Sequence, residues 1–203
     1  MGRDLSTAQE AALATIHPVL GDDFYLAGGV AVALRIHHRG SRDLDLFTSD
    51  AEPESFEERL AQLPDVRVSA RAPGTLHLEV GGVPVSLLRY RYPLLHPPEP
   101  SELVPVRLAS VDDLICMKLS AIGGRGARRD FWDLHRLLAA SGVSLEAALV
   151  LFARKFASMD RGHVVRALAY FADADSEPMP AELDGAGWER IKADLEAQVL
   201  ALP

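Results

Sequence analysis

The stretch "YLAGGVAVALRIHHRGSRDLDLF", residues 25–47, decides the expected fold of the chain. An apolar run ends at the glycine pair Gly28 and Gly29, and a short apolar segment follows before Asp43 and Asp45 alternate with leucines. Alternation with period two is typical of a strand, whereas the length and flanks of the apolar segment favour a helix. The stretch therefore predicts a strand, a glycine turn, a helix and a second strand.

The two aspartates are the first candidates for chemistry. Residues i and i+2 of a strand point to the same face, so we expect Asp43 and Asp45 to lie side by side. Neighbouring carboxylates raise each other's pKa unless a cation lies between them. Mg²⁺ is commonly bound by carboxylates together with substrate phosphates. The spacing alone leaves a second interpretation open, in which both aspartates are solvated on an exposed edge strand.

The glycine pair lies where the first strand passes into the helix. Glycine there lets the backbone approach a phosphate, and a helix N-terminus offers its N–H groups to an anion. A tight turn that needs positive φ is the alternative for Gly28 and Gly29. The order of the elements would bring a phosphate-binding turn and a metal site onto neighbouring strands.

Residues 25–47 resemble the signature of the nucleotidyltransferase (polymerase β-like) superfamily, a glycine turn followed by an Asp-x-Asp strand. The pattern "RGSRDLDLF", residues 39–47, further resembles the AbiEii/AbiGii toxin family of type IV toxin–antitoxin systems. A later stretch, "MKLSAIGGRGARRDFWDLHRLL" at residues 117–138, is similar to the same family. The matching positions there are Lys118, Ala121, Arg125, Asp130, Asp133 and Leu134.

The resemblance implies transfer of a nucleoside monophosphate from a nucleoside triphosphate (NTP) to an acceptor, with pyrophosphate leaving. It implies that Mg²⁺, or Mn²⁺ in its place, is held by Asp43 and Asp45. The implied nucleotide-binding residues are Gly28, Gly29, Arg39, Ser41 and Arg125. The implied catalytic residues are Asp43, Asp45, Lys118 and Asp130, with Lys118 and Arg125 on the triphosphate and Asp130 orienting or deprotonating the acceptor.

Lys118 and Asp130 also have ordinary interpretations. Lys118 falls beside an apolar helical stripe, from which its ammonium can reach solvent. Asp130 opens a predicted helix, where a carboxylate suits the helix dipole. Within the family pattern we expect both residues in the active site. Asp133 lies one turn later and could instead pair with Arg129 or Arg136.

The chain departs from the superfamily pattern at one position. Many nucleotidyltransferases carry a third carboxylate on a later strand, where it serves as general base. The corresponding strand here, "VPVSLLRYRY" at residues 83–92, has Ser86 at that position, and Glu79 is the nearest carboxylate in sequence. A catalytically degenerate protein that binds a nucleotide or an antitoxin is therefore an alternative. Because the resemblance implies that Lys118 and Asp130 share the role of the missing third carboxylate, we favour an active enzyme.

The acceptor is expected to be anionic. The formal net charge of −8 argues against coating nucleic acid through bulk charge. Arg125, Arg128 and Arg129 nevertheless form a local basic cluster, which favours tRNA or another RNA. A small-molecule nucleotidyltransferase acting on an aminoglycoside is the alternative, and it would need an acidic acceptor pocket. The family resemblance also implies an antitoxin protein as a partner.

The remaining sequence indicates the overall organisation. Three strand patterns with glycine turns precede a proline-rich link at residues 93–105, and helical patterns follow. We expect an α+β protein with a small mixed-sheet nucleotidyltransferase core at residues 1–108. A helical C-terminal half, residues 109–203, is expected to complete an active-site cleft. Cys116 lies in an apolar run and is expected to be a buried thiol. No apolar run approaches the roughly 18 residues of a membrane span, so we expect a cytoplasmic protein without membrane contact.

Overall fold

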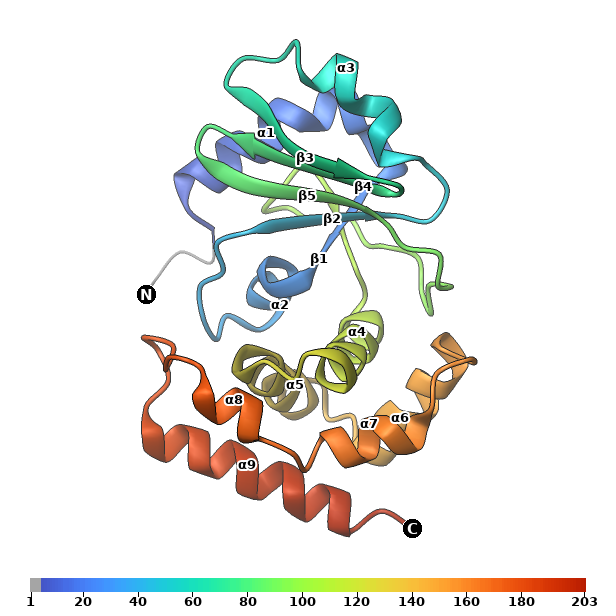
Figure 1. Ribbon diagram of the computed structural model, residues 1–203, viewed down its shortest axis with the longest axis vertical. Coiled ribbons are helices and arrows are strands. Elements are labelled where there is room, and N and C mark those ends of the chain that lie inside the picture. Colours follow the sequence, from blue (N-terminus) through green and yellow to red (C-terminus); the bar gives the residue numbers. More distant parts are fainter. Residues whose placement is uncertain (1–4) are drawn as a thin grey trace. The chain divides into compact units, whose positions relative to one another are not determined.

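The computed structural model describes residues 5–203. The chain divides into two compact units, residues 1–110 and 111–203 (Figure 1). A six-stranded mixed sheet with helices forms the first unit, and helices alone form the second. The predicted α+β fold class is confirmed.

The sheet of the first unit has the strand order β3-β4-β5-β2-β1-β6. β1 is antiparallel to β2 and parallel to β6, β2 is parallel to β5, and β3, β4 and β5 form an antiparallel meander. The strands are β1 Tyr25–Ala27, β2 Leu44–Thr48, β3 Val66–Ala72, β4 Thr75–Val80, β5 Val83–Arg89 and β6 Arg107–Leu108.

Helices lie on both sides of this sheet. In Figure 1, α1 and α3 lie on one side of it and α2 on the other. α1 packs on β5, and α2 packs on β1 and β2. The helical segments of this unit are α1 Thr7–Leu20, η1 Gly21–Asp23, α2 Gly28–Ile36, η2 Pro53–Phe56 and α3 Glu57–Leu60, η marking a 3₁₀ helix.

Period-two alternation gives β4 and β5 one apolar and one polar face. In β4, Leu76, Leu78 and Val80 are buried, whereas the residues between them are half-buried. Two turns with positive φ set the strand register: Gly74 (φ 73°) joins β3 to β4, and Gly81 with Gly82 (φ 56° and 82°) joins β4 to β5. The polar face therefore carries side chains from fixed positions on neighbouring strands.

The second unit is built around α4 and α5. α4 packs on α5, α6 and α7, and α5 also contacts α8 and α9. Phe131, Phe171 and Trp188 form an aromatic core, with ring centroids 5.0 to 6.1 Å apart. The helices are α4 Val111–Gly124, α5 Arg128–Ser141, α6 Leu145–Lys155, α7 Arg161–Ala167, α8 Ala172–Ser176 and α9 Gly185–Leu200. Cys116 is buried, as expected, and burial raises the pKa of its thiol to about 12.

Within residues 5–203, no single helix combines the length and the hydropathy needed to cross a membrane. Only α5 and α6 taken together, across a bend of 110°, meet those criteria.

Candidate active site

The glycine turn holds the carboxylate of Asp45 against the start of α2. Ala27, the last residue of β1, is paired with Asp45 in the sheet, and Gly28 follows it with φ 67°. A Cβ atom on Gly28 would overlap Oδ2 of Asp45. Glycine is therefore required here both by the backbone conformation and by the neighbouring carboxylate. As a result, Asp45 lies beside the N–H groups of the first turn of α2.

The second glycine packs against the loop that leads into β2. A Cβ atom on Gly29 would lie 2.6 Å from Oγ of Ser41 and 3.1 Å from Nη2 of Arg39. Arg39 is buried, and the side-chain amide of Gln9 fixes the loop by donating a 2.8 Å hydrogen bond to the carbonyl oxygen of Ser41. The structure thus brings the predicted nucleotide-binding residues of the first unit together around the turn.

The two aspartates differ in their surroundings. β2 begins at Leu44, so Asp43 precedes the strand and is exposed, whereas Asp45 is half-buried within it. No group of three His, Cys, Asp or Glu side chains in residues 5–203 is placed to hold a metal ion. A pair of carboxylates does not fit a closed structural zinc site. It fits Mg²⁺, which keeps water and phosphate oxygens among its ligands.

The strand next to Asp45 carries Ser86, as the sequence predicts. Ser86 of β5 is paired with Asp45 of β2. Glu79 is one strand further away on β4, and its carboxylate lies 2.9 Å from Nη2 of Arg67. The neighbour of Ser86 on the other side is His77, whose Nδ1 lies 3.2 Å from Oγ of Ser86. Sequence reasoning missed His77, although counting back from the Gly81-Gly82 turn would have placed it opposite Ser86.

Lys118 is buried in the second unit, between two carboxylates of α5. Its Nζ lies 3.0 Å from Oδ1 of Asp130 and 2.6 Å from Oδ2 of Asp133, and both carboxylates are fully buried. Asp130 and Asp133 are three residues apart on one helix face, so both reach the same ammonium. The ammonium therefore does not extend to solvent beside the apolar stripe, and Asp133 pairs with Lys118.

Arg125 completes this cluster from the joint between α4 and α5. Its Nε and Nη2 donate to the two carboxylate oxygens of Asp130 at 2.8 and 3.0 Å, while its side chain stays 70% exposed. Burial by itself would raise the pKa of Asp130, but the hydrogen bond from Arg125 and the charges of Lys118 and Arg125 outweigh it. The pKa of Asp130 is consequently lowered. Asp130 is thus suited to holding cations and poorly suited to accepting a proton.

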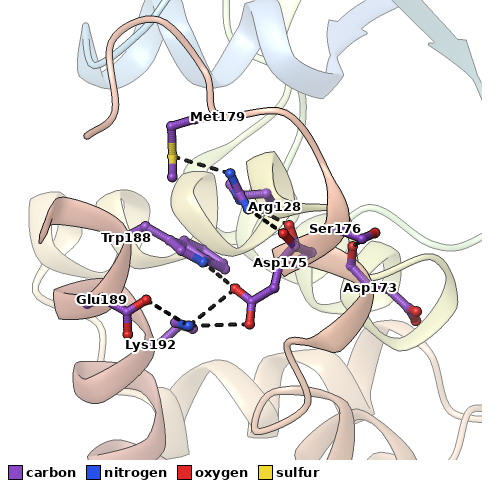
Figure 2. A network of polar contacts seen from close by, with 9 residues as sticks. Arg128, Asp173, Asp175, Ser176, Met179, Trp188, Glu189 and Lys192 are labelled. Atoms are coloured by element: carbon purple, nitrogen blue, oxygen red, sulfur yellow. Dashed lines mark hydrogen bonds and ion pairs between the residues drawn. The ribbon is translucent and has the colours of Figure 1, made fainter. Parts of the chain in front are cut away.

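Arg128 has a different position from the expected one. It is buried, and it donates to the carbonyl oxygens of Ala174 and Asp175 at 3.0 Å each (Figure 2). Its guanidinium also lies over the ring of Trp188, whose indole N–H donates to Asp175. That hydrogen bond is the largest cause of the lowered pKa of Asp175. Arg128 therefore links α8 and α9 to α5, and its guanidinium is bound by groups of the second unit itself.

A cavity of about 420 Å³ lies in the second unit beside Arg125. It is lined by the glycine-rich end of α4, by Arg125, His163, Arg166 and Tyr170, and by the carboxylate of Asp173. His163 is held there by a 2.7 Å hydrogen bond between its Nε2 and the carbonyl oxygen of Gly123. The cavity therefore combines cationic groups with aromatic rings.

Two solved structures share the fold. The solution structure of the antibiotic-resistance factor ANT(2'')-Ia matches with a TM-score of 0.54 and 18% identity, over 74% of this chain and 92% of that one. The crystal structure of ANT(2'')-Ia in complex with adenylyl-2''-tobramycin matches with a TM-score of 0.58 and 18% identity, over 74% and 98%. At this level of identity, the likeness concerns the fold alone.

Two sequence matches extend over almost the whole chain. The uncharacterised protein aq_aa25 of Aquifex aeolicus (strain VF5) is 35% identical over 204 residues, which cover 96% of this chain and 99% of that protein. The family described as "Nucleotidyl transferase AbiEii toxin, Type IV TA system" matches residues 11–201. The chain therefore belongs to the AbiEii nucleotidyl transferase toxin family, and it is a nucleotidyltransferase.

Proposed function

We propose that the protein transfers a nucleoside monophosphate from an NTP to RNA in a Mg²⁺-dependent reaction, and that it is the toxin of a type IV toxin–antitoxin pair. The observation that carries this proposal is the packing of the glycine turn. Gly28 and Gly29 leave room only for backbone beside Asp45, Ser41 and Arg39. A carboxylate therefore lies beside Gly28, and a hydroxyl and a guanidinium lie beside Gly29, at the end of α2 that carries free N–H groups. These groups suit a metal-bound triphosphate.

Each candidate site residue of the first unit has a proposed role. Asp43 and Asp45 hold Mg²⁺ or Mn²⁺, which neutralises the charge of the triphosphate when bound. The N–H groups of Gly28 and Gly29 and the hydroxyl of Ser41 donate to phosphate oxygens. The buried guanidinium of Arg39 keeps the loop in place and adds positive charge.

The second unit supplies cations in this proposal. Arg125 binds the triphosphate with its largely exposed guanidinium, while Lys118 contributes its charge from within the cluster. Asp130 is a positioning residue, because its carboxylate orients both Arg125 and Lys118. Its lowered pKa supports this role and not that of a base.

RNA is the proposed acceptor because of the cavity beside Arg125. Guanidinium groups from Arg125 and Arg166 suit phosphates, and the rings of Tyr170 and His163 suit an unstacked base. An aminoglycoside is a polycation, and it would meet like charge at these two arginines, which outnumber the one lining carboxylate, that of Asp173. A tRNA end is the form of RNA we propose. The antitoxin partner is proposed from the family description alone.

Wild-type protein incubated with unfractionated tRNA, each α-³²P-labelled NTP and Mg²⁺ should transfer label to RNA. EDTA should abolish the transfer, and excess Mg²⁺ or Mn²⁺ should restore it, because two aspartates without a metal cannot neutralise a triphosphate. Parallel reactions replace tRNA with tobramycin or omit the acceptor. Label on tobramycin would identify a small-molecule nucleotidyltransferase. Binding of NTP in calorimetry without transfer to any acceptor would identify a nucleotide-binding protein.

A Gly28→Ala variant should lose about tenfold in affinity for Mg²⁺·NTP, or about 1.4 kcal/mol. The new Cβ atom displaces the carboxylate of Asp45, and it also strains a backbone with φ 67°. Gly81→Ala is the matched control, since Gly81 has φ 56° but open space around it. Both variants should lower the melting temperature, and calorimetry should show weaker binding in Gly28→Ala alone. Equal affinity in the two variants would contradict the proposed position of the triphosphate.

A further inference from the structure

The proposed transfer requires a group that accepts the proton of the attacking hydroxyl. Asp130 is unsuited to this task, because Arg125 and Lys118 occupy both of its carboxylate oxygens and its pKa is lowered. Glu79 is less suited as well, since it is paired in the sheet with Pro84 and not with Ser86, and its carboxylate lies beside Arg67. The proton acceptor therefore has to be sought among groups that lie next to Asp45.

A row of paired residues crosses the polar face of the sheet at Asp45. The register pairs His77 of β4 with Ser86 of β5, Ser86 with Asp45 of β2, and Asp45 with Ala27 of β1. Paired residues on neighbouring strands lie about 4.8 Å apart and point to the same face. His77, Ser86 and Asp45 are all half-buried, so each of these side chains keeps some contact with solvent.

The hydrogen bond within this row joins a hydroxyl to an imidazole. Nδ1 of His77 lies 3.2 Å from Oγ of Ser86. In the neutral tautomer with its proton on Nε2, His77 accepts the hydroxyl proton of Ser86 at Nδ1. A hydroxyl and a base within hydrogen-bond reach form the arrangement by which proteins move protons from attacking groups.

We propose that Ser86 and His77 form the proton relay for the acceptor hydroxyl, an inference that rests on the proposed function. The acceptor oxygen forms a bond to the α-phosphorus, and the bond from that phosphorus to the oxygen bridging the β-phosphorus breaks, so that pyrophosphate leaves. The acceptor proton passes to Oγ of Ser86 while the Ser86 proton passes to Nδ1 of His77. The resulting imidazolium returns its proton to water, so the step is balanced without a further reactant.

The charged groups around His77 permit this role. Glu79 lies two residues further along the same face of β4 and is paired with Arg67 of β3. Ser86 separates His77 from Asp45 in the row. Protonated His77 would thus form near two carboxylates, one of them already neutralised by Arg67.

The relay is tested by kinetics of His77→Gln, Ser86→Ala and the matched control Glu79→Gln. The assay measures transfer of label from α-³²P-NTP to unfractionated tRNA, with calorimetry of Mg²⁺·NTP binding beside it. Both His77→Gln and Ser86→Ala should lower kcat by about 10²- to 10⁴-fold, the usual contribution of a general base. The KM and affinity for NTP should stay unchanged, and Glu79→Gln should behave as wild type.

Three readouts separate a relay from a structural hydrogen bond. The wild-type rate should fall with decreasing pH as the base of the relay becomes protonated, and His77→Gln should lack this fall. Imidazole in the buffer should restore part of the activity of His77→Ala. Independently of activity, ¹H–¹⁵N correlation spectra of the imidazole should show the Nε2–H tautomer, with an Nδ1 shift that changes in Ser86→Ala.

The results distinguish this inference from the proposed function. Wild-type kcat in His77→Gln, or loss of transfer in Glu79→Gln, would overturn the relay while leaving the nucleotidyl transfer in place. Weakened NTP binding in His77→Gln with unchanged kcat would overturn the relay too, because the role of His77 would then be to stabilise the structure of the sheet. If wild-type protein transfers label to no acceptor, the proposed function fails, and the relay fails with it.

Discussion

An Asp45→Asn variant should lose nucleotidyl transfer by about 10³-fold or more while remaining folded. A metal ion supplies several kcal/mol of charge stabilisation in the transition state, and each 1.36 kcal/mol is a factor of ten in rate. Asparagine keeps the shape that Gly28 accommodates but removes the charge that holds the metal. The apo melting temperature should change little, because β2 and its register are unaltered.

The measurement compares transfer to unfractionated tRNA, Mg²⁺-dependent NTP binding and the melting temperature. Asp50→Asn is the matched control, an exposed aspartate just beyond the other end of β2. Expression in growing bacteria should stop growth for wild type and Asp50→Asn but not for Asp45→Asn. If Asp45→Asn binds and transfers nucleotide normally, Asp45 is not a metal ligand. A large loss of apo stability would instead mark it as structural.

The turn around Gly28 could be predicted from the sequence because its elements are defined locally. Period two indicates β2, and glycines between two apolar runs indicate a turn. The exposure of Asp43 was not predictable in this way. Alternation gives Asp43 and Asp45 the same face, but it does not say that the ladder of hydrogen bonds begins at Leu44.

The pairing of Ser86 with His77 could be predicted from the sequence, whereas the pairing of Ser86 with Asp45 could not. The two-residue turn at Gly81-Gly82 fixes Val80 opposite Val83, and counting outward puts His77 opposite Ser86. The pairing of β5 with β2 has no such local origin. Two other strands separate them in the sequence, so the neighbourhood of Ser86 and Asp45 depends on the order of the sheet.

The positions of the cations in the second unit depend on tertiary packing. The three-residue spacing of Asp130 and Asp133 shows that they share a helix face, but not that this face meets Lys118 of α4. Arg128 donates a hydrogen bond to the carbonyl oxygen of Ala174, which lies 46 residues further along the chain. No spacing rule within one helix predicts such a partner, which is why the sequence alone favours a local basic cluster of Arg125, Arg128 and Arg129.

A Lys118→Met variant should lose about 3–5 kcal/mol of stability in the second unit. Methionine fills a similar volume, but it leaves the carboxylates of Asp130 and Asp133 buried without the ammonium between them.

The dependence of this stability on pH follows from the lowered pKa of Asp130. The stability that the Asp130 carboxylate contributes is fully present above its pKa in the unfolded chain, about 3.9. It is lost as the pH falls through the lowered pKa of Asp130 in the folded protein. Without Lys118 that folded pKa rises, so acid unfolding should begin at a higher pH.

Urea unfolding followed by tryptophan fluorescence measures this unit alone, because Trp132 and Trp188 are the two tryptophans of the chain and both lie in it. Lys192→Met is the matched control, a more exposed lysine whose ion pairs with Asp175 and Glu189 are worth at most about 1 kcal/mol. Adding Asp133→Asn to Lys118→Met removes one stranded charge and should recover part of the loss, whereas Asp133→Asn alone should destabilise. Additive effects of Lys118→Met and Asp133→Asn would show that the ammonium and this carboxylate do not interact, and Lys118 would then be available to a ligand at no cost to the fold.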